Sequence, residues 1–272
     1  MYSFTLIPGT VFDAEGGPAG APYAPGKDYT STRHGRFVIG SVGPHVSSSK
    51  WRYSVIPWGA PIRLDAKKYV EVQINGRWVH LHTLRSWRDD FLTDPAGARK
   101  ELEREYASMS SWLKRQFGMG EKEFLPGSWG GALPKYWMLN DFGQVAIKYF
   151  VDYNGNRKLD SNPKRGVKKE ELLSDFLHTT SYYEMVNVLN RELHRKVTMQ
   201  PGTSHGCVHM VPNVVQDWVK KGILKVGATL QIHDYAVTLV PRGFEKPEGS
   251  VGQEIHFFPG AKKIALYNVV KK

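Results

Sequence analysis

Two runs of alternating apolar and polar residues flank an Asn-Gly pair and constrain the fold more than any other feature. The first run covers residues 69–74 and the second covers residues 77–81, with Asn75 and Gly76 between them. Alternation with a period of two is typical of a strand with one buried face, and Asn-Gly favours the tight turn of a β-hairpin. We therefore predict a hairpin over residues 69–81.

Short apolar-rich runs bounded by polar or glycine-rich turns predict further strands. β-Branched and aromatic residues, which are enriched in strands, recur in these runs. We predict strands at residues 2–6, 36–41, 51–56, 143–153, 175–179 and 226–232. Together with the hairpin, they favour a mainly β fold.

Apolar residues at helical spacing predict two long helices. The first covers residues 94–117, where Asp94 before Pro95 suits an N-cap and Gly118 suits the end of the helix. The second covers residues 183–196. Shorter helices are predicted at residues 168–174 and 213–222.

The size and the N-terminus leave several cellular locations open. The chain has 272 residues, of which 41% are hydrophobic, so one large domain or two small ones can bury a core. No apolar run approaches the length of a membrane span. The N-terminus has neither the basic region nor the apolar region of a signal peptide. A signal peptide removed earlier, another export route and retention inside the cell all stay open.

The chain carries an excess of basic residues, with a formal charge of +11. A basic surface can attract nucleic acid, an anionic membrane or another anionic polymer. Lys and Arg are dispersed, and the sequence contains no zinc-finger spacing, basic heptad region or other nucleic-acid motif. We therefore predict no nucleic-acid partner. Two alternatives remain for the basic residues, a solvated surface and attraction to an anionic polymer of the cell envelope.

The only cysteine, Cys207, lies in the sequence SHGCV at residues 204–208. A thiolate is a strong nucleophile, but an ordinary thiol is only a few per cent ionised at neutral pH. A catalytic cysteine therefore needs a basic neighbour, and His178 in the predicted strand at 175–179 is a candidate. Gly206 would let backbone N–H groups approach a substrate carbonyl and hold an oxyanion. The alternative is a buried, unreactive cysteine beside chance histidines.

The sequence SHGCV resembles the signature of the L,D-transpeptidase catalytic domain, in which a small residue, His-Gly, the nucleophilic Cys and an aliphatic residue follow one another. Residues 30–40 are similar to the segment with which these domains often begin, and the resemblance covers residues 28–235. The family's base is a histidine before the cysteine motif. His178 takes this place here, 29 residues before Cys207 (207 − 178 = 29). His209 stands where the family usually has arginine.

The resemblance implies an L,D-transpeptidase-like catalytic domain, a mainly β fold of β-sandwich or mixed-sheet type with inserted helices. The N-terminal strand and a segment rich in glycine, proline and alanine occupy residues 1–27. The catalytic domain would cover residues 28–240, with helical insertions near 94–118 and 183–196, and a C-terminal extension would cover 241–272.

The resemblance also implies the roles of the site residues. Cys207 would be the nucleophile and His178 its base, with His194 as the rival base because it is nearer in sequence (207 − 194 = 13). Gly206 and Ser204 complete the catalytic set. Substrate-binding roles are predicted for His205, His209, Thr179, Trp129 and Trp137.

No cofactor and no metal are predicted. The oxygen-rich segment at residues 152–160 is similar to the start of a calcium loop, but Arg157 stands where an EF-hand needs glycine. We therefore interpret this segment as a turn.

The implied substrates and partners are the stem peptides of bacterial peptidoglycan, in the periplasm or cell envelope. A thioester on Cys207 would be resolved by an amine or by water. We predict transfer to an amine, because the helix near 95–117 and the aromatic segment 129–137 could cover the cleft and exclude water. The alternatives are an L,D-carboxypeptidase or a wall-directed cysteine hydrolase such as a toxin, and a non-catalytic basic wall-binding protein. The oligomeric state is not predicted.

Overall fold

The chain divides into two compact units, both built from segments that are distant in sequence. The first unit comprises residues 1–43, 145–179 and 199–272, and the second comprises residues 44–144 and 180–198. The structure, a computed structural model, describes residues 2–21, 29–47, 51–88, 94–118, 134–192, 194, 196–237, 239 and 252–271.

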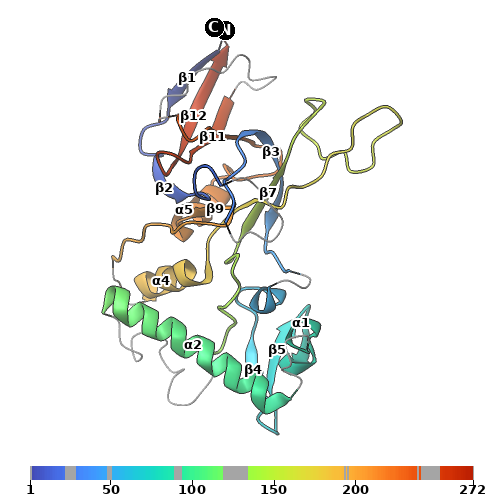
Figure 1. The fold of residues 1–272 in the computed structure, drawn as a ribbon, viewed down its shortest axis with the longest axis vertical. Helices are drawn as coiled ribbons and strands as arrows, with labels where there is room; N and C mark the ends of the chain where they lie inside the picture. Colours follow the sequence, from blue (N-terminus) through green and yellow to red (C-terminus); the bar gives the residue numbers. More distant parts are fainter. Residues whose placement is uncertain are drawn as a thin grey trace. The chain divides into compact units, whose positions relative to one another are not determined.

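A nine-stranded mixed sheet forms the framework of the first unit (Figure 1). Its strands lie in the order β1-β12-β11-β10-β3-β7-β8-β9-β2, and β2 also pairs with β12. The pairing therefore closes into a ring from β12 through β2, with β1 added beside β12. The strands are β1 (Tyr2–Leu6), β2 (Phe12–Glu15), β3 (Gly35–Gly43), β7 (Ala146–Phe150), β8 (Phe176–His178), β9 (Val208–Met210), β10 (Thr229–Ile232), β11 (Gly252–Phe258) and β12 (Lys263–Lys271).

The N-terminal and C-terminal segments of the chain both belong to this sheet. β1 pairs antiparallel with β12, with Tyr2 opposite Lys271. Residues 1–27 thus contribute β1 and β2, and the predicted C-terminal extension at 241–272 contributes β11 and β12. The strand predicted to close the domain is β10, which lies between β3 and β11 rather than at an edge.

The helix α5, Pro212–Lys220, supplies the main apolar cover of this sheet. Its residues Val214, Val215 and Trp218 are buried in one cluster with strand residues such as Leu177 and Val208. Burial of side chains of this size stabilises the fold by roughly 1.5–3 kcal/mol each. The cluster therefore fixes β8 and β9 beside each other beneath the helix.

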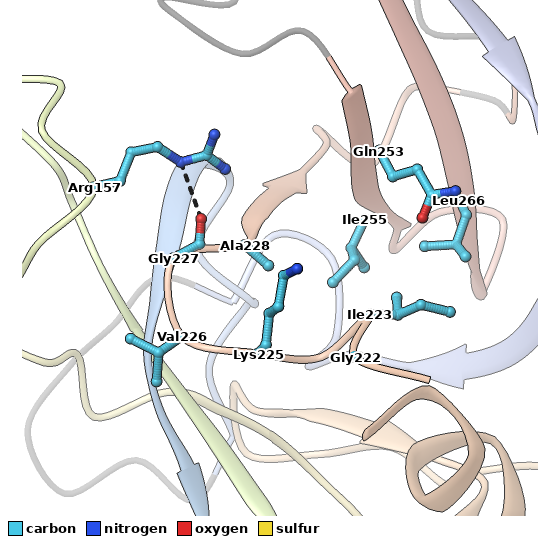
Figure 2. A pocket seen from close by; sticks show the side chains of 10 residues that line it. All are labelled: Arg157, Gly222, Ile223, Lys225, Val226, Gly227, Ala228, Gln253, Ile255 and Leu266. Atoms are coloured by element: carbon cyan, nitrogen blue, oxygen red, sulfur yellow. Dashed lines mark hydrogen bonds between the residues drawn. The ribbon is translucent and has the colours of Figure 1, made fainter. Parts of the chain in front are cut away.

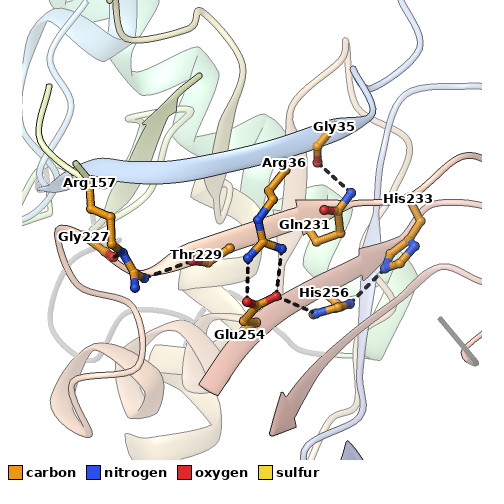
Figure 3. A network of polar contacts seen from close by, with 9 residues as sticks. All are labelled: Gly35, Arg36, Arg157, Gly227, Thr229, Gln231, His233, Glu254 and His256. Atoms are coloured by element: carbon orange, nitrogen blue, oxygen red, sulfur yellow. Dashed lines mark hydrogen bonds and ion pairs between the residues drawn. The ribbon is translucent and has the colours of Figure 1, made fainter. Parts of the chain in front are cut away.

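A chain of buried polar side chains joins β3 to β11 and to the residue after β10 (Figure 3). Arg36 donates two hydrogen bonds to the Glu254 carboxylate, with N–O distances of 2.6 and 2.9 Å. His256 Nε2 lies 3.4 Å from the same carboxylate, and its Nδ1 lies 3.0 Å from His233 Nε2. A carboxylate only accepts, so His256 carries its proton on Nε2 and accepts from His233 at Nδ1. Glu254 and His256 alternate along β11 with the core residue Ile255, which puts them on the opposite face of the sheet from the apolar cluster.

The second unit contains a three-stranded sheet of β4 (Ile62–Leu64), β5 (Val70–Ile74) and β6 (Arg77–His80). The predicted hairpin is confirmed, since β5 and β6 pair antiparallel around Asn75 and Gly76. Both turn residues have positive φ angles, 50° and 78°. Tight hairpin turns of this kind require that conformation at both central positions.

The helix α2, Pro95–Phe117, also lies in the second unit and is confirmed with both of its predicted ends. The Asp94 carboxylate accepts the N–H groups of Ala96 and Gly97, each at 2.9 Å, and Gly118 ends the helix with a φ of 65°. The residues used to predict this helix form its buried face: Leu102, Tyr106, Met109 and Leu113. The other helices within the described residues are η1 (Arg52–Val55), η2 (Leu81–Thr83), α1 (Arg85–Arg88) and α4 (Ser181–Glu192).

Two of the sequence predictions are wrong in their type of structure. The strand predicted at 51–56 is the 3₁₀ helix η1, in which the Ser54 N–H donates to the Trp51 carbonyl. Residues 168–174 do not form a helix. Leu173 N–H instead donates to the Tyr149 carbonyl of β7, and the buried Glu170 carboxylate accepts backbone N–H groups of a neighbouring loop. Because the Leu173 N–H donates to β7, it is not available for a hydrogen bond within a helix.

The predicted fold class is confirmed at the level of a mainly β protein with a few helices. Within the described ranges, no helix has the length and apolar character needed to cross a bilayer.

Candidate active site

Cys207 lies immediately before β9, the strand that pairs with β8, and β8 carries His178. β8 and β9 run parallel, with Leu177 opposite Val208 and His178 opposite His209. One position further back, the Phe176 N–H donates to the Cys207 sulfur at 3.4 Å. The half-buried thiol is therefore fixed against the start of the strand that ends in the candidate base.

His178, at the end of β8, and His209, in the middle of β9, contact each other and have defined tautomers. The rings of His178 and His209 meet edge to face, with their centroids 4.9 Å apart. His178 Nδ1 lies 2.5 Å from the Thr179 carbonyl, and His209 Nδ1 lies 2.8 Å from the Gly202 carbonyl. A carbonyl oxygen only accepts, so each Nδ1 carries a proton and each lone pair is on Nε2. His178 thus has the tautomer that a general base requires.

Gly206 is required by the loop that presents the cysteine. Its φ is 114°, and a Cβ atom there would lie 2.6 Å from the Thr30 hydroxyl. The Ser204 hydroxyl accepts the Gly206 N–H at 3.1 Å and donates to the Cys207 carbonyl. The bond to the Ser204 hydroxyl occupies the Gly206 N–H, the group that we expect from the sequence to bind an oxyanion. The Cys207 N–H takes part in none of the hydrogen bonds shown among the described residues, so it is the donor that the loop retains for this role.

Three polar residues that no prediction from the sequence included hold this loop through hydrogen bonds. The Thr30 hydroxyl donates to the His205 carbonyl at 2.9 Å, and the Thr32 hydroxyl lies 3.4 Å from the Cys207 carbonyl. The Tyr235 hydroxyl in turn accepts the Thr32 N–H at 3.0 Å. Thr30 and Thr32 belong to the segment at 30–40 that carries the weaker part of the family resemblance. That resemblance was the one sequence signal for their position, and no signal marked Tyr235.

The thiol is held in its protonated form in this arrangement. Burial raises the pKa of Cys207 to about 12, and the nearby Asp175 carboxylate adds to the increase, whereas the Phe176 N–H opposes it. Burial also raises the pKa of Asp175, against the effect of Arg33, whose Nε lies 3.9 Å from the carboxylate. At neutral pH the Cys207 side chain is therefore a thiol rather than a thiolate.

We predict that Asp175→Asn makes Cys207 more reactive. Removal of the carboxylate removes a negative charge that disfavours the thiolate, and Arg33 then favours it. Alkylation by iodoacetamide, followed by intact mass at pH 8, should become at least about twofold faster. Asp217→Asn, which removes an exposed carboxylate paired with Lys221, serves as the control and should leave the rate unchanged. Slower alkylation of Asp175→Asn would contradict this electrostatic account.

His194 belongs to the second unit, whereas His178 and Cys207 belong to the first. His194 is exposed and has a left-handed backbone with a φ of 49°. His178 is 4% exposed and is held by the hydrogen bond to Thr179. A base must keep one orientation toward the nucleophile, and a buried, hydrogen-bonded ring satisfies this condition better than an exposed one.

We therefore predict that His178→Ala slows acylation of Cys207 by roughly 10²-fold or more. The matched variant His194→Ala should change the rate much less. The rate of covalent labelling by a carbapenem, measured by intact mass, compares both variants with the wild type. A larger loss in His194→Ala would show that the assignment of the base is wrong.

The other predicted substrate-binding residues have different surroundings. His205 is exposed, and its ring stacks on Tyr29 with a centroid distance of 4.6 Å. Thr179 is fully buried and contacts His178 through its backbone carbonyl. Trp137 is fully buried in the second unit, where it packs on Trp87 and donates to the Tyr53 carbonyl at 2.9 Å. Its predicted role in a groove is corrected to one in a core. Trp129 and the aromatic segment before residue 134 lie outside the described residues.

The first unit thus brings together the Cys207 thiol, the buried His178 ring and the backbone N–H of Cys207. In the described part of the chain, no group of three or more His, Cys, Asp or Glu side chains could hold a metal ion. Burial lowers the pKa of His209, so this histidine is neutral at pH 7 and does not replace the charge of an arginine. Comparisons of the chain with models of protein families, with curated proteins and with solved structures give no match.

Proposed function

We propose that this protein is a cysteine-dependent acyltransferase of the L,D-transpeptidase type, with the corresponding catalytic fold in its first unit. The observation that carries the proposal is the position of Cys207 immediately before β9, which pairs in parallel with β8, the strand that ends in His178. The SHGCV sequence supports it, because Ser204 and Gly206 shape the loop that presents the thiol. The proposed substrates are peptidoglycan stem peptides, which places the protein in the periplasm or cell envelope.

In the acylation step, Cys207 Sγ attacks the carbonyl carbon of an L-centred residue that is linked to a terminal D-amino acid. His178 Nε2 takes the thiol proton while the C–S bond forms. The carbonyl electron pair moves to oxygen, where the Cys207 N–H donates to it. One such donor is typically worth about 3–4 kcal/mol in the transition state. The intermediate then breaks its C–N bond, and the imidazolium gives its proton to the departing D-amino acid.

The thioester is resolved by the same groups in the reverse order. An amine from a second stem peptide attacks the thioester carbonyl, and His178 accepts the proton of that amine. The C–S bond breaks, the sulfur regains the proton from His178, and a new amide bond is released. Water in place of the amine would give a tripeptide and no cross-link. We propose transfer as the main outcome.

Mass spectrometry of purified stem tetrapeptide incubated with the full chain tests this proposal. Parallel reactions contain no additive or an added D-amino acid as acceptor. A cross-linked dimer, or a product with the exchanged D-residue, is expected. Tripeptide alone at every acceptor concentration would establish a carboxypeptidase instead. No product, together with a Cys207 that carbapenem does not label, would overturn the enzymatic proposal and favour the wall-binding alternative.

A further inference from the structure

β7, β8 and β9 place the candidate base on the face of the sheet that lies opposite the apolar cluster. Ile147, Leu177 and Val208 belong to that cluster, and side chains alternate between the two faces along a strand. The residues next to them, which the registers of the three strands place beside one another, therefore share the other face: Ala146, Lys148, Phe176, His178 and His209. Lys148 is the only lysine or arginine among these five residues.

A single residue, Phe176, connects Lys148 with the Cys207 thiol. Lys148 Nζ lies 4.9 Å from the centroid of the Phe176 ring, and the Phe176 N–H donates to the Cys207 sulfur at 3.4 Å. The negative face of an aromatic ring attracts a cation. The ring therefore holds the ammonium group next to the thiol, on the face of the sheet that carries His178.

The charge of Lys148 is not balanced by a carboxylate. Its neighbours across the sheet are neutral, with Ser41 on β3 and Phe176 on β8. Within the described part of the chain, no aspartate or glutamate forms an ion pair with Lys148. The side chain is only half-buried, so a ligand can reach it. A cation without a counter-ion at such a position favours an anionic ligand.

Two arginines that also pack on this sheet are engaged elsewhere. Arg36 donates to the Glu254 carboxylate (Figure 3). Arg157 Nε donates to the Gly227 carbonyl at 3.0 Å (Figure 2). Arg157 also lines a pocket of about 400 Å³, but none of the residues assigned to acyl transfer lines that pocket. Neither arginine is therefore placed to bind a substrate at the thiol.

Two other basic residues lie close to the thiol but offer no free charge. Arg33 Nε lies 3.9 Å from the Asp175 carboxylate, which balances its charge. Burial lowers the pKa of His209, so this histidine is neutral at pH 7. Lys148 thus supplies the positive charge that His209 does not.

We propose that Lys148 binds the terminal carboxylate of the peptide that Cys207 attacks. The proposal rests on acyl transfer at Cys207, because that reaction supplies a departing D-amino acid with a free carboxylate. This carboxylate belongs to the residue directly after the cleaved bond. Its contact with the ammonium group places the scissile carbonyl at the thiol. Lys148 therefore selects peptides that end one residue after that bond, since an amidated peptide has no negative charge at this position.

Two peptides that differ in a single group test this selection. They are the stem tetrapeptide and the same peptide with its terminal carboxyl group amidated, and mass spectrometry gives kcat/KM for each. The unmodified protein should prefer the acid by at least about fivefold, mainly through KM, because the contact forms when the substrate binds. Lys148→Met keeps a long side chain without the charge and should bring the ratio of acid to amide close to one. Lys148→Arg restores the charge and should restore the preference.

Equilibrium binding distinguishes a failure of this proposal from a failure of the proposed reaction. Isothermal titration calorimetry uses the full chain with Cys207→Ala, which cannot cleave either peptide. The acid should bind at least about fivefold more tightly than the amide, and the added change Lys148→Met should remove this difference. The comparison in Cys207→Ala alone keeps the test valid if Lys148→Met disturbs the sheet.

Lys168→Met is the matched control for the binding experiment. Lys168 Nζ also lies over an aromatic ring, 3.6 Å from the centroid of Tyr153, but both residues are exposed and lie outside the three strands. This variant should keep the full preference for the acid. Equal binding of acid and amide, or a preference that persists in Lys148→Met, would overturn the role of Lys148 even if the protein transfers acyl groups. A preference that depends on Lys148 in a protein that cleaves neither peptide would support the carboxylate site and exclude the proposed reaction.

Discussion

Alanine at position 207 is expected to abolish acyl transfer while the protein remains folded. Cys207 is the only thiol in the chain, so no other side chain can form the thioester. Removal of a catalytic nucleophile lowers turnover by roughly 10³-fold or more, because the base and the oxyanion donor have no attacking atom to assist. Product formation from stem tetrapeptide, measured by mass spectrometry, gives the size of this loss.

The structural cost of the same change should be small. Cys207 is half-buried, and its sulfur accepts a weak hydrogen bond from the Phe176 N–H. We expect the free energy of unfolding in urea to fall by no more than about 1 kcal/mol. Cys207→Ser is the matched variant, since it keeps a polar atom of similar size but a much weaker nucleophile. Full activity in Cys207→Ala would exclude cysteine acyl transfer.

Local sequence patterns predicted the elements whose stability is also local. The hairpin at 69–81 depends on two turn residues with positive φ, and α2 depends on Asp94 and Gly118 at its ends. These signals act within a few residues, so the sequence shows them directly. The strand predicted at 51–56 is wrong because its local pattern is ambiguous: an apolar run of that length does not distinguish a strand from a short helix.

The closure of the large sheet could not be predicted from the sequence. β1 pairs with β12 and β3 pairs with β10 across most of the length of the chain, and no local pattern specifies such partners. The Thr32 N–H and the Tyr235 hydroxyl form a hydrogen bond near the Cys207 loop for the same reason, although these residues are 203 positions apart. The motif therefore identified the thiol and its loop, whereas the residues that support the loop required the three-dimensional arrangement.

The Cys207 environment shows the same difference between motif and arrangement. The sequence predicted His178 as the base and backbone N–H groups near Gly206 as oxyanion donors. Ser204 engages the Gly206 N–H, and burial raises the pKa of the thiol. Neither effect is visible in a sequence, because both depend on what lies around the loop. Together they favour proton transfer to His178 during attack over a resting thiolate.

Glu254→Gln is expected to destabilise the first unit strongly. The Glu254 side chain is completely buried and accepts two hydrogen bonds from Arg36, while His256 lies 3.4 Å away. The substitution leaves Arg36 without its counter-ion. Breaking a buried ion pair in this way typically costs 3–5 kcal/mol, and we expect about 3 kcal/mol because the Arg36 side chain is still 25% exposed. Urea unfolding at pH 7.5 measures this change. Glu171→Gln, in an exposed pair of the same unit, should leave the midpoint unchanged.

The buried histidines next to Glu254, His233 and His256, make the stability of the first unit depend on pH. Burial, with His256 as a neighbour, lowers the pKa of His233 to about 3, and burial also lowers the pKa of His256. The unfolded chain, with histidine pKa values near 6.5, therefore binds more protons than the folded protein below pH 6.5. The stability that these residues contribute is complete above about pH 6.5 and falls as the pH decreases; for His233 the decline continues toward pH 3, by up to about 1.4 kcal/mol per pH unit. His233→Gln, which still offers a donor to His256, should flatten this decline between pH 6.5 and 4.5. An equally steep decline in that variant would show that groups other than His233 cause the acid sensitivity.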